Sequence, residues 1–226
     1  PAIQKLMIRH FKNETTTTKT NSDHFVFSDS FKNLGTIKQT GINLAILPRA
    51  VNLKLFEFIQ SLDLTIFPAI QTSFYAYECA TVLSMLLKNI TADKQGLEIL
   101  ISDLTEVTQQ FSAIVHSELV RFRLQVVDND MCRYFHCDYN NLRLISTYSG
   151  DGTQWIANEN LNRNKLGCQN NKEIVKDSSN IHQMKPFWVG IFKGELFLNN
   201  HGNGIIHRSP PISDRSKRRL LLRIDA

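Results

Sequence analysis

The spacing of the apolar residues changes from a helical period to a strand period near residue 118, and this change most constrains the fold. Between residues 52 and 117, apolar side chains recur every three or four positions, which predicts helices. From Val120 to Val126, apolar and polar residues alternate strictly, which is the period of a half-buried strand. We therefore expect a helical part followed by a β-rich part.

Three helices are expected in the first part. Their apolar positions span residues 53–67, 77–87 and 97–115. In the third helix, Asp103 and Glu106 stand three residues apart with charges of the same sign, so we expect them on a solvated face.

Many short strand-like runs separated by turn residues follow residue 118. The runs after the first one lie at 142–148, 153–156, 187–192, 195–198, 205–207 and 219–224. Short strands without helices between them favour an antiparallel barrel or sandwich. The predicted fold class is α+β, with a helical N-terminal part and then a β-domain.

The predicted organisation has three segments. Residues 1–34 are expected to form a poorly ordered N-terminal arm, because Asn13–Asp23 is polar and repetitive. Residues 35–117 form the helical part and residues 118–226 the β-domain. The last two segments are expected to pack as one compact unit.

Composition and charge narrow the function classes. Apolar residues make up 42% of the chain and charged residues 21%, which rules out global disorder. No apolar stretch approaches the roughly 20 residues of a membrane span. The N-terminus has no signal-peptide pattern and the four cysteines no C-x-x-C spacing, so we expect a cytoplasmic protein. The net charge of +5 is concentrated near residues 215–219, without interleaved aromatics, so a nucleic-acid partner is not expected.

The densest cluster of chemistry lies in the β-domain. In His136-Cys137-Asp138 the imidazole and the carboxylate are two positions apart, which places them on one face of a strand. A second histidine, His207, follows much later on another apolar segment. Two histidines and one carboxylate suit a divalent metal with open positions, either Fe(II) or Zn(II).

The order of these elements resembles the double-stranded β-helix, a jelly-roll or cupin-like fold, of the 2-oxoglutarate- and Fe(II)-dependent oxygenases. That pattern is H-x-D, a long insertion, a distal histidine and a basic residue about ten positions beyond it. The resemblance implies that His136, Asp138 and His207 bind Fe(II). It also implies that Arg218 or Arg219 binds the distal carboxylate of 2-oxoglutarate; strand alternation lets only one of them face inward.

Other side chains are weaker candidates for this site. Tyr148 and Thr147 could hydrogen-bond a bound keto acid, and Lys193 offers a further cation for an acidic co-substrate. Cys132 is near enough in sequence to serve as a soft ligand, which would favour zinc. For each of them, an ordinary structural role is the simpler interpretation.

A closer resemblance covers about residue 35 to the C-terminus. It is carried by five stretches: Ile42-Asn43-Leu44-Ala45-Ile46, Gly152-Thr153-Gln154-Trp155, Asn160-Leu161-Asn162-Arg163, Phe192-Lys193-Gly194-Glu195 and, most distinctively, His207-Arg208-Ser209-Pro210-Pro211. In these motifs the chain is similar to an uncharacterised bacterial family, the domain of unknown function numbered eighteen twenty-six. The family carries no established reaction that could be transferred.

The leading functional hypothesis is a dioxygenase that uses Fe(II) and 2-oxoglutarate to hydroxylate a C–H bond. The alternative is a non-catalytic metal-binding protein in zinc or metal handling or regulation, because the same three ligands bind zinc well. The substrate, a small molecule or a protein, and the oligomeric state stay open.

Overall fold

The computed structural model describes residues 24–129, 132–211 and 218–226. The polar segment Asn13–Asp23 lies outside the described residues. None of the helices in the described part combines the length and the apolar character that a membrane-crossing helix needs.

Within the described residues, ten strands form two sheets. The strands are β1 (Phe25–Phe27), β2 (Leu44–Leu47), β3 (Ile70–Tyr75), β4 (Leu119–Val127), β5 (Leu142–Ser149), β6 (Gln154–Trp155), β7 (His182–Gln183), β8 (Val189–Lys193), β9 (His207–Arg208) and β10 (Arg219–Asp225). The large sheet has the order β1-β2-β8-β5-β10-β4-β3, and the small sheet has the order β7-β6-β9. The two sheets pack on each other through a core that includes Ile145, Phe192 and Trp155.

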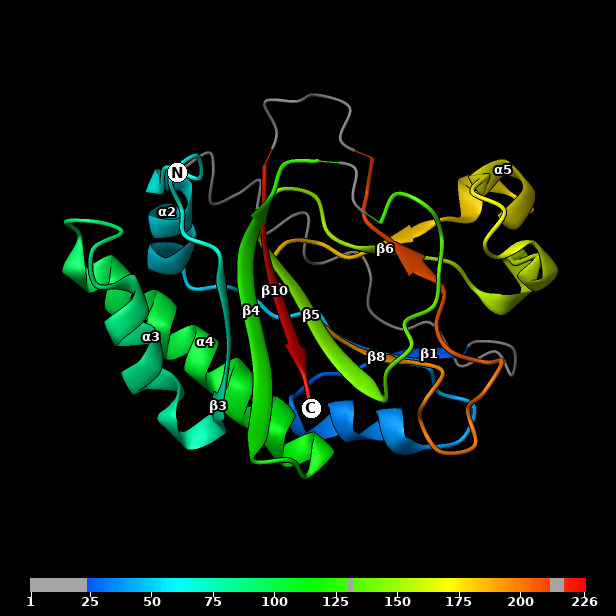
Figure 1. Cartoon of the computed structure of the whole chain (residues 1–226), viewed down its shortest axis with the longest axis horizontal. Helices are drawn as coiled ribbons and strands as arrows, with labels where there is room; N and C mark the ends of the chain where they lie inside the picture. The colour runs from blue at the N-terminus through cyan, green and yellow to red at the C-terminus, as the bar shows by residue number, and fades with distance from the viewer. Residues whose placement is uncertain (1–23, 130–131, 212–217) are drawn as a thin grey trace.

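The longer helices lie on the other side of the large sheet (Figure 1). The α-helices are α2 (Leu53–Ser61), α3 (Cys79–Leu87), α4 (Lys94–Val115) and the short α5 (Asn171–Ile174). Single-turn or short 3₁₀ helices are η1 (Lys32–Lys38), η2 (Ala76–Glu78), η3 (Asn158–Asn160), η4 (Arg163–Lys165) and η5 (Ser178–Asn180). The largest core contains apolar residues of α2, α3 and α4 together with residues of the large sheet.

Side chains of successive strand residues point to opposite faces, and each face of the large sheet therefore has its own partner. We call the face that packs on the small sheet the inner face; on β5 it carries Ile145 and Thr147. The helix-covered face carries Leu144 and Tyr148 of the same strand.

The predicted helical part at residues 35–117 is not a separate helical unit. The three expected helices are present, but β2 and β3 from this region are strands of the large sheet. In β2 all four residues are apolar, because Leu44 and Ile46 enter the inner core while Ala45 and Leu47 enter the helix-covered core. Such a run carries no alternation and does not read as a strand from periodicity alone.

Two local predictions are also corrected. The expected strand at 195–198 is a turn, because the Glu195 carboxylate accepts hydrogen bonds from the backbone N–H groups of Gly202 and Gly204. Asp103 does not lie on a solvated face: it forms a part-buried ion pair with Arg49.

The segment at 158–181 is long, polar and rich in asparagine, and it contains η3, η4, α5 and η5. It has a small core of its own, built from Leu161, Ile174 and Val175 with Phe135, Ile156 and Ile206. Asn160 fastens the segment internally, since its side-chain amide donates to the carbonyls of Asp177 and Asn180.

Candidate metal centre

His136, Asp138 and His207 come together at the inner face. One ligand atom from each lies within 4.8 Å of the others, the arrangement expected of a group that could hold a metal ion. His136 and His207 face each other in an isolated antiparallel bridge, and each backbone N–H donates to the other's carbonyl at 3.0 Å. The two imidazole centroids are therefore only 4.7 Å apart.

Backbone contacts select the tautomer of both histidines. The Nδ1 of His136 lies 2.9 Å from the carbonyl of Tyr134, and the Nδ1 of His207 lies 3.3 Å from the carbonyl of Ile205. A carbonyl only accepts hydrogen bonds, so in the neutral rings Nδ1 carries the proton and Nε2 keeps its lone pair. Both Nε2 atoms face Asp138, at 3.8 Å for His136 and 3.4 Å for His207. This is the form of histidine that ligates metals.

Asp138 is held as a carboxylate. Burial opposes its ionisation, but His207, Arg143 and His136 outweigh burial and hold the pKa of Asp138 well below its usual range. Arg143 Nη1 forms an ion pair with Asp138 Oδ2 at 2.6 Å. Each carboxylate oxygen has two lone pairs, so Asp138 keeps acceptor capacity toward a cation beside this ion pair.

Arg219 lies on the inner face at the start of β10. Only 3% of it is exposed. Its guanidinium donates to the hydroxyls of Ser209, Thr147 and, at 3.5 Å, Thr153. Within the described residues no carboxylate pairs with it, and its Nε has no hydrogen bond at all. Burial lowers the pKa of Arg219 to about 10, and the charge of Asp151, which forms no ion pair with it, offsets this only in part.

Arg218 does not share this position. It is half-buried just before β10 and borders a surface hollow of about 280 Å³ that also touches Arg219 and Gly150. Gly150 has a φ of +82°, and a Cβ there would lie 2.7 Å from the Arg218 carbonyl oxygen. The Gly-x-Gly turn after β5 therefore lets the chain approach the start of β10 closely.

The structure does not bring Tyr148 and Lys193 to this cluster. Tyr148 is on the helix-covered face, where its hydroxyl bonds Asp103 of α4, and burial raises its pKa well above the usual value. Lys193 lies on the same side as Val189 and Ile191 of β8, which belong to the helix-covered core. Its Nζ donates to the Gln39 carbonyl at 2.9 Å.

The cysteines near the ligands differ in environment. Cys132 is exposed and its side chain contacts that of His136, a contact that lowers the pKa of the thiol. Cys137 is partly buried against the small core at 158–181, and burial raises its pKa to about 12.

Sequence reasoning missed three polar residues around Asp138. Arg143 contacts Asp138 and also binds Asp225, with Nε at 2.6 Å from Oδ1 and Nη2 at 3.0 Å from Oδ2. Arg223, two positions before Asp225 on β10, faces the same side. The signal was present in Arg219, Arg223 and Asp225, whose even spacing places them on one face of a strand, but the strands that they would face could not be read from one segment.

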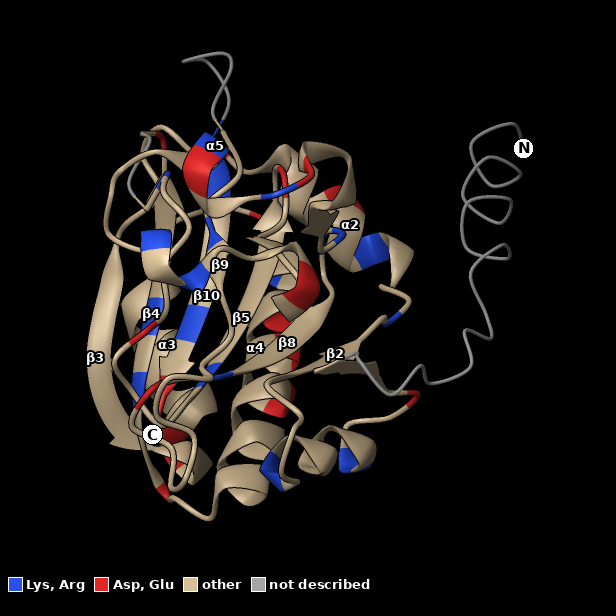
Figure 2. Cartoon of the chain, turned by 90° about the vertical axis from the view of Figure 1, so that its right-hand side faces the viewer, with Lys and Arg blue, Asp and Glu red and all other residues tan. Residues whose placement is uncertain are grey.

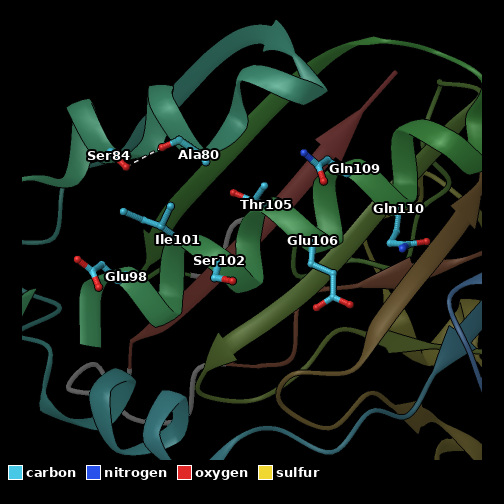
Figure 3. A pocket seen from close by; sticks show the side chains of 9 residues that line it. All are labelled: Ala80, Ser84, Glu98, Ile101, Ser102, Thr105, Glu106, Gln109 and Gln110. Atoms are coloured by element: carbon cyan, nitrogen blue, oxygen red, sulfur yellow. Dashed lines mark hydrogen bonds between the residues drawn. The ribbon is translucent and has the colours of Figure 1, made fainter. Parts of the chain in front are cut away.

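A larger surface hollow lies away from this chemistry. It is an open groove of about 450 Å³ between α3 and α4 (Figure 3), with a lining that includes Ser84, Glu98, Thr105 and Gln109. These two helices lie on the helix-covered side, so the groove does not lead to His136, Asp138 and His207.

Solved structures share this fold at low sequence identity. The chain resembles dioxygenase for auxin oxidation 1 from Arabidopsis thaliana in its complex with 2-oxoglutarate, with a TM-score of 0.51, 11% identity and coverage of 89% of this chain and 91% of that chain. The likeness shows the fold, the jelly roll of these oxygenases.

Two weaker similarities have TM-scores under 0.5. The rice dioxygenase for auxin oxidation gives 0.47 at 8% identity, covering 86% of this chain and 77% of that one. A full-length protein of Neurospora crassa, solved in complex with alpha-KG and 5-formyluracil, gives 0.43 at 9% identity, covering 94% and 87%.

None of the curated proteins matches the sequence of this chain. A family model does match, and it spans nearly all of the described fold, from residue 28 to residue 225. Its extent includes every described strand except β1, together with the helices and the His-Asp-His cluster. The chain belongs to the family described as protein of unknown function DUF1826.

Proposed function

We propose that this protein is an Fe(II)- and 2-oxoglutarate-dependent dioxygenase. His136, Asp138 and His207 would hold the metal, and Arg219 would bind the distal carboxylate of 2-oxoglutarate. The observation that carries the proposal is Arg219, a buried guanidinium without a counter-ion among the described residues, on the same sheet face as the three ligands.

The residues present fit these two cofactors. Two imidazole Nε2 lone pairs and one carboxylate are the donor set that leaves positions open on ferrous iron. The fork of Arg219 suits a carboxylate, which it can bind through two parallel hydrogen bonds. The hydroxyls of Thr147 and Ser209 hold that fork in place.

Once bound, iron and 2-oxoglutarate would supply the oxidising power for hydroxylation. The chain's own residues position them and exclude water. The carbonyls of Tyr134 and Ile205 orient the two rings, while Phe192 packs edge-on against His207 with centroids 5.0 Å apart. Trp155 and Ile145 close the adjacent core.

Arg219 rather than Arg218 is proposed for the co-substrate, because Arg219 alone of the two is buried on the inner face. Tyr148 and Lys193 are left out of the site, since both lie on the other side of the sheet. We also propose that residues 35–226 act as one compact unit, because β2 and β3 complete the sheet that carries the site.

The proposal is tested by anaerobic titration of Fe(II) into metal-free protein, with and without 2-oxoglutarate. A metal-to-ligand charge-transfer band that needs both components is the expected result. Arg219→Gln should weaken the binding of 2-oxoglutarate by at least about 10-fold. Arg218→Gln should leave this affinity nearly unchanged. Absence of the band, or equal effects of the two variants, would contradict the proposal.

Zinc binding without catalysis is the second candidate, and the contact between Cys132 and His136 favours it. A thiolate ligand would shift preference toward zinc. Competition between Zn(II) and Fe(II) in the wild type and in Cys132→Ser separates the two. Zinc that iron cannot displace, and that Cys132→Ser releases, would support metal handling.

A further inference from the structure

Four arginines of the large sheet share the inner face, and one of them, Arg143, contacts Asp138. Arg123 of β4 is directly opposite Arg223 of β10, and Arg121 and Arg143 belong to the next row across the sheet, joined through Asp225. Residues opposite each other share a face. Figure 2 shows the resulting blue segments on the neighbouring strands β4 and β10.

The nearby carboxylates are already engaged by Arg143. Its guanidinium binds Asp225 through two hydrogen bonds and contacts Asp138 at 2.6 Å. Arg223 is left with one distant contact, its Nε at 3.9 Å from Asp225 Oδ2. That Nε is buried without a hydrogen-bond partner among the described residues.

Arg123 has no better partner. Its neighbour on the other side is the neutral Gln71 of β3, and in the described part of the chain no ion pair with Arg123 occurs. Like charges directly opposite each other destabilise a sheet. We call Arg123 and Arg223 the arginine pair. The repulsion between their two charges destabilises the fold, and a bound anion would offset it.

Solvent can reach this part of the inner face. Gln71 and Arg121 at its edge are exposed, and both members of the arginine pair are half-buried. On the other side, Arg223 is opposite Ile145, which belongs to the core between the sheets. The arginine pair therefore stands between open solvent and the enclosed interior beside Asp138.

We infer that the arginine pair binds an acidic group of the primary substrate, a carboxylate, phosphate or sulfonate, next to the metal centre. This inference rests on the proposed function and deepens it by assigning the substrate class. Arg219 and Arg223 are four residues apart on β10, roughly 13 Å along a strand. A small dicarboxylate held by Arg219 therefore leaves Arg223 available for a second anion.

The test uses protein loaded with Fe(II) and 2-oxoglutarate under anaerobic conditions, which fills the Arg219 site. Acetate, inorganic phosphate and methanesulfonate are titrated separately by calorimetry, so that the three arms identify the acidic group. At least one should bind saturably, and Arg223→Gln and Arg123→Gln should each weaken it about 10-fold or more, the cost of a lost charge-assisted hydrogen bond.

Arg121→Gln is the matched control, because it removes the same charge from the same strand and face, two residues from Arg123. Its effect should be clearly smaller. No saturable anion binding, an equal loss in Arg121→Gln, or a loss of 2-oxoglutarate binding in Arg223→Gln as large as in Arg219→Gln would overturn the inference.

Failure of the proposed function is visible separately. If wild-type protein binds neither iron nor 2-oxoglutarate, the dioxygenase proposal fails by itself. The same anions are then titrated into metal-free Arg219→Gln protein, in which the arginine pair is the remaining site. Binding that Arg223→Gln removes from this background supports an anion site, and no binding overturns it.

Discussion

The two faces of the large sheet bury polar groups in different ways. On the helix-covered face, Arg49 binds Asp103 with Nη2 2.8 Å from Oδ2, and Tyr148 bonds the same carboxylate. On the inner face, Arg219 is buried with hydroxyl partners only, and the arginine pair has a single distant carboxylate contact among the described residues. Buried charge that the fold satisfies internally supports structure, whereas buried charge that it leaves unsatisfied marks a place for a ligand.

The largest expected effect comes from removing a ligand at the inner face. His136→Ala, Asp138→Ala and His207→Ala should each abolish stoichiometric Fe(II) binding, because losing one of three ligands costs more than the roughly 10–100-fold of an outer partner. His201→Ala is the control, since that imidazole is exposed. Metal analysis after dialysis measures the effect, with circular dichroism to verify folding. Full metal content in the three variants would refute the site.

Opposite stability changes are expected when one arginine is removed from each face. Arg49→Met leaves Asp103 part-buried without its cation and should lower the free energy of unfolding by about 3 kcal/mol. Arg219→Met removes a cation that has no counter-ion in the described part of the chain and should raise it by about 1–2 kcal/mol in metal-free protein. Urea unfolding of both variants without 2-oxoglutarate measures the difference. A loss of stability in Arg219→Met comparable to that in Arg49→Met would break the comparison between the faces.

Lys193 is the exception on the helix-covered side, a buried cation with one carbonyl partner, and burial lowers its pKa to about 8. The unfolded chain, with a lysine pKa near 10.4, binds this proton more tightly than the native state does. Stability should therefore rise between about pH 8 and pH 10.4, by up to about 3 kcal/mol. Lys193→Met should remove this component, so the difference in unfolding free energy between the two proteins should vary over that range. A difference in unfolding free energy that does not vary with pH would show that the pKa of Lys193 is not lowered in the native state.

The smallest effect is expected at the outer partner of the metal centre. Asp225→Asn weakens the hold on Arg143, which in turn contacts Asp138, so Fe(II) affinity should fall about 10-fold. Asp128→Asn, at an exposed position, should have no effect. Competition with a chelator measures both affinities, and unchanged affinity in Asp225→Asn would confine the role of Arg143 to stability.

Local sequence was sufficient for the elements whose pattern is self-contained. The strand β4 and the helix α4 follow from periodicity, because each has one buried face and shows it as alternation or as a helical repeat. The strands β5 and β10 follow from short strand-like runs bounded by turn residues. The three metal-ligand candidates were also found from sequence, since His136 and Asp138 are two positions apart and a distal histidine stands on another apolar segment.

Only the tertiary structure decided on which face of the large sheet each side chain lies. The choice between Arg218 and Arg219 depends on the register of β10 against β4 and β5, and a shift of one residue would exchange them. The same register places Arg223 opposite Arg123 and leaves Tyr148 on the helix-covered face. Sequence determines which residues alternate, but pairing between distant strands determines what they face, because those contacts join segments far apart in the chain.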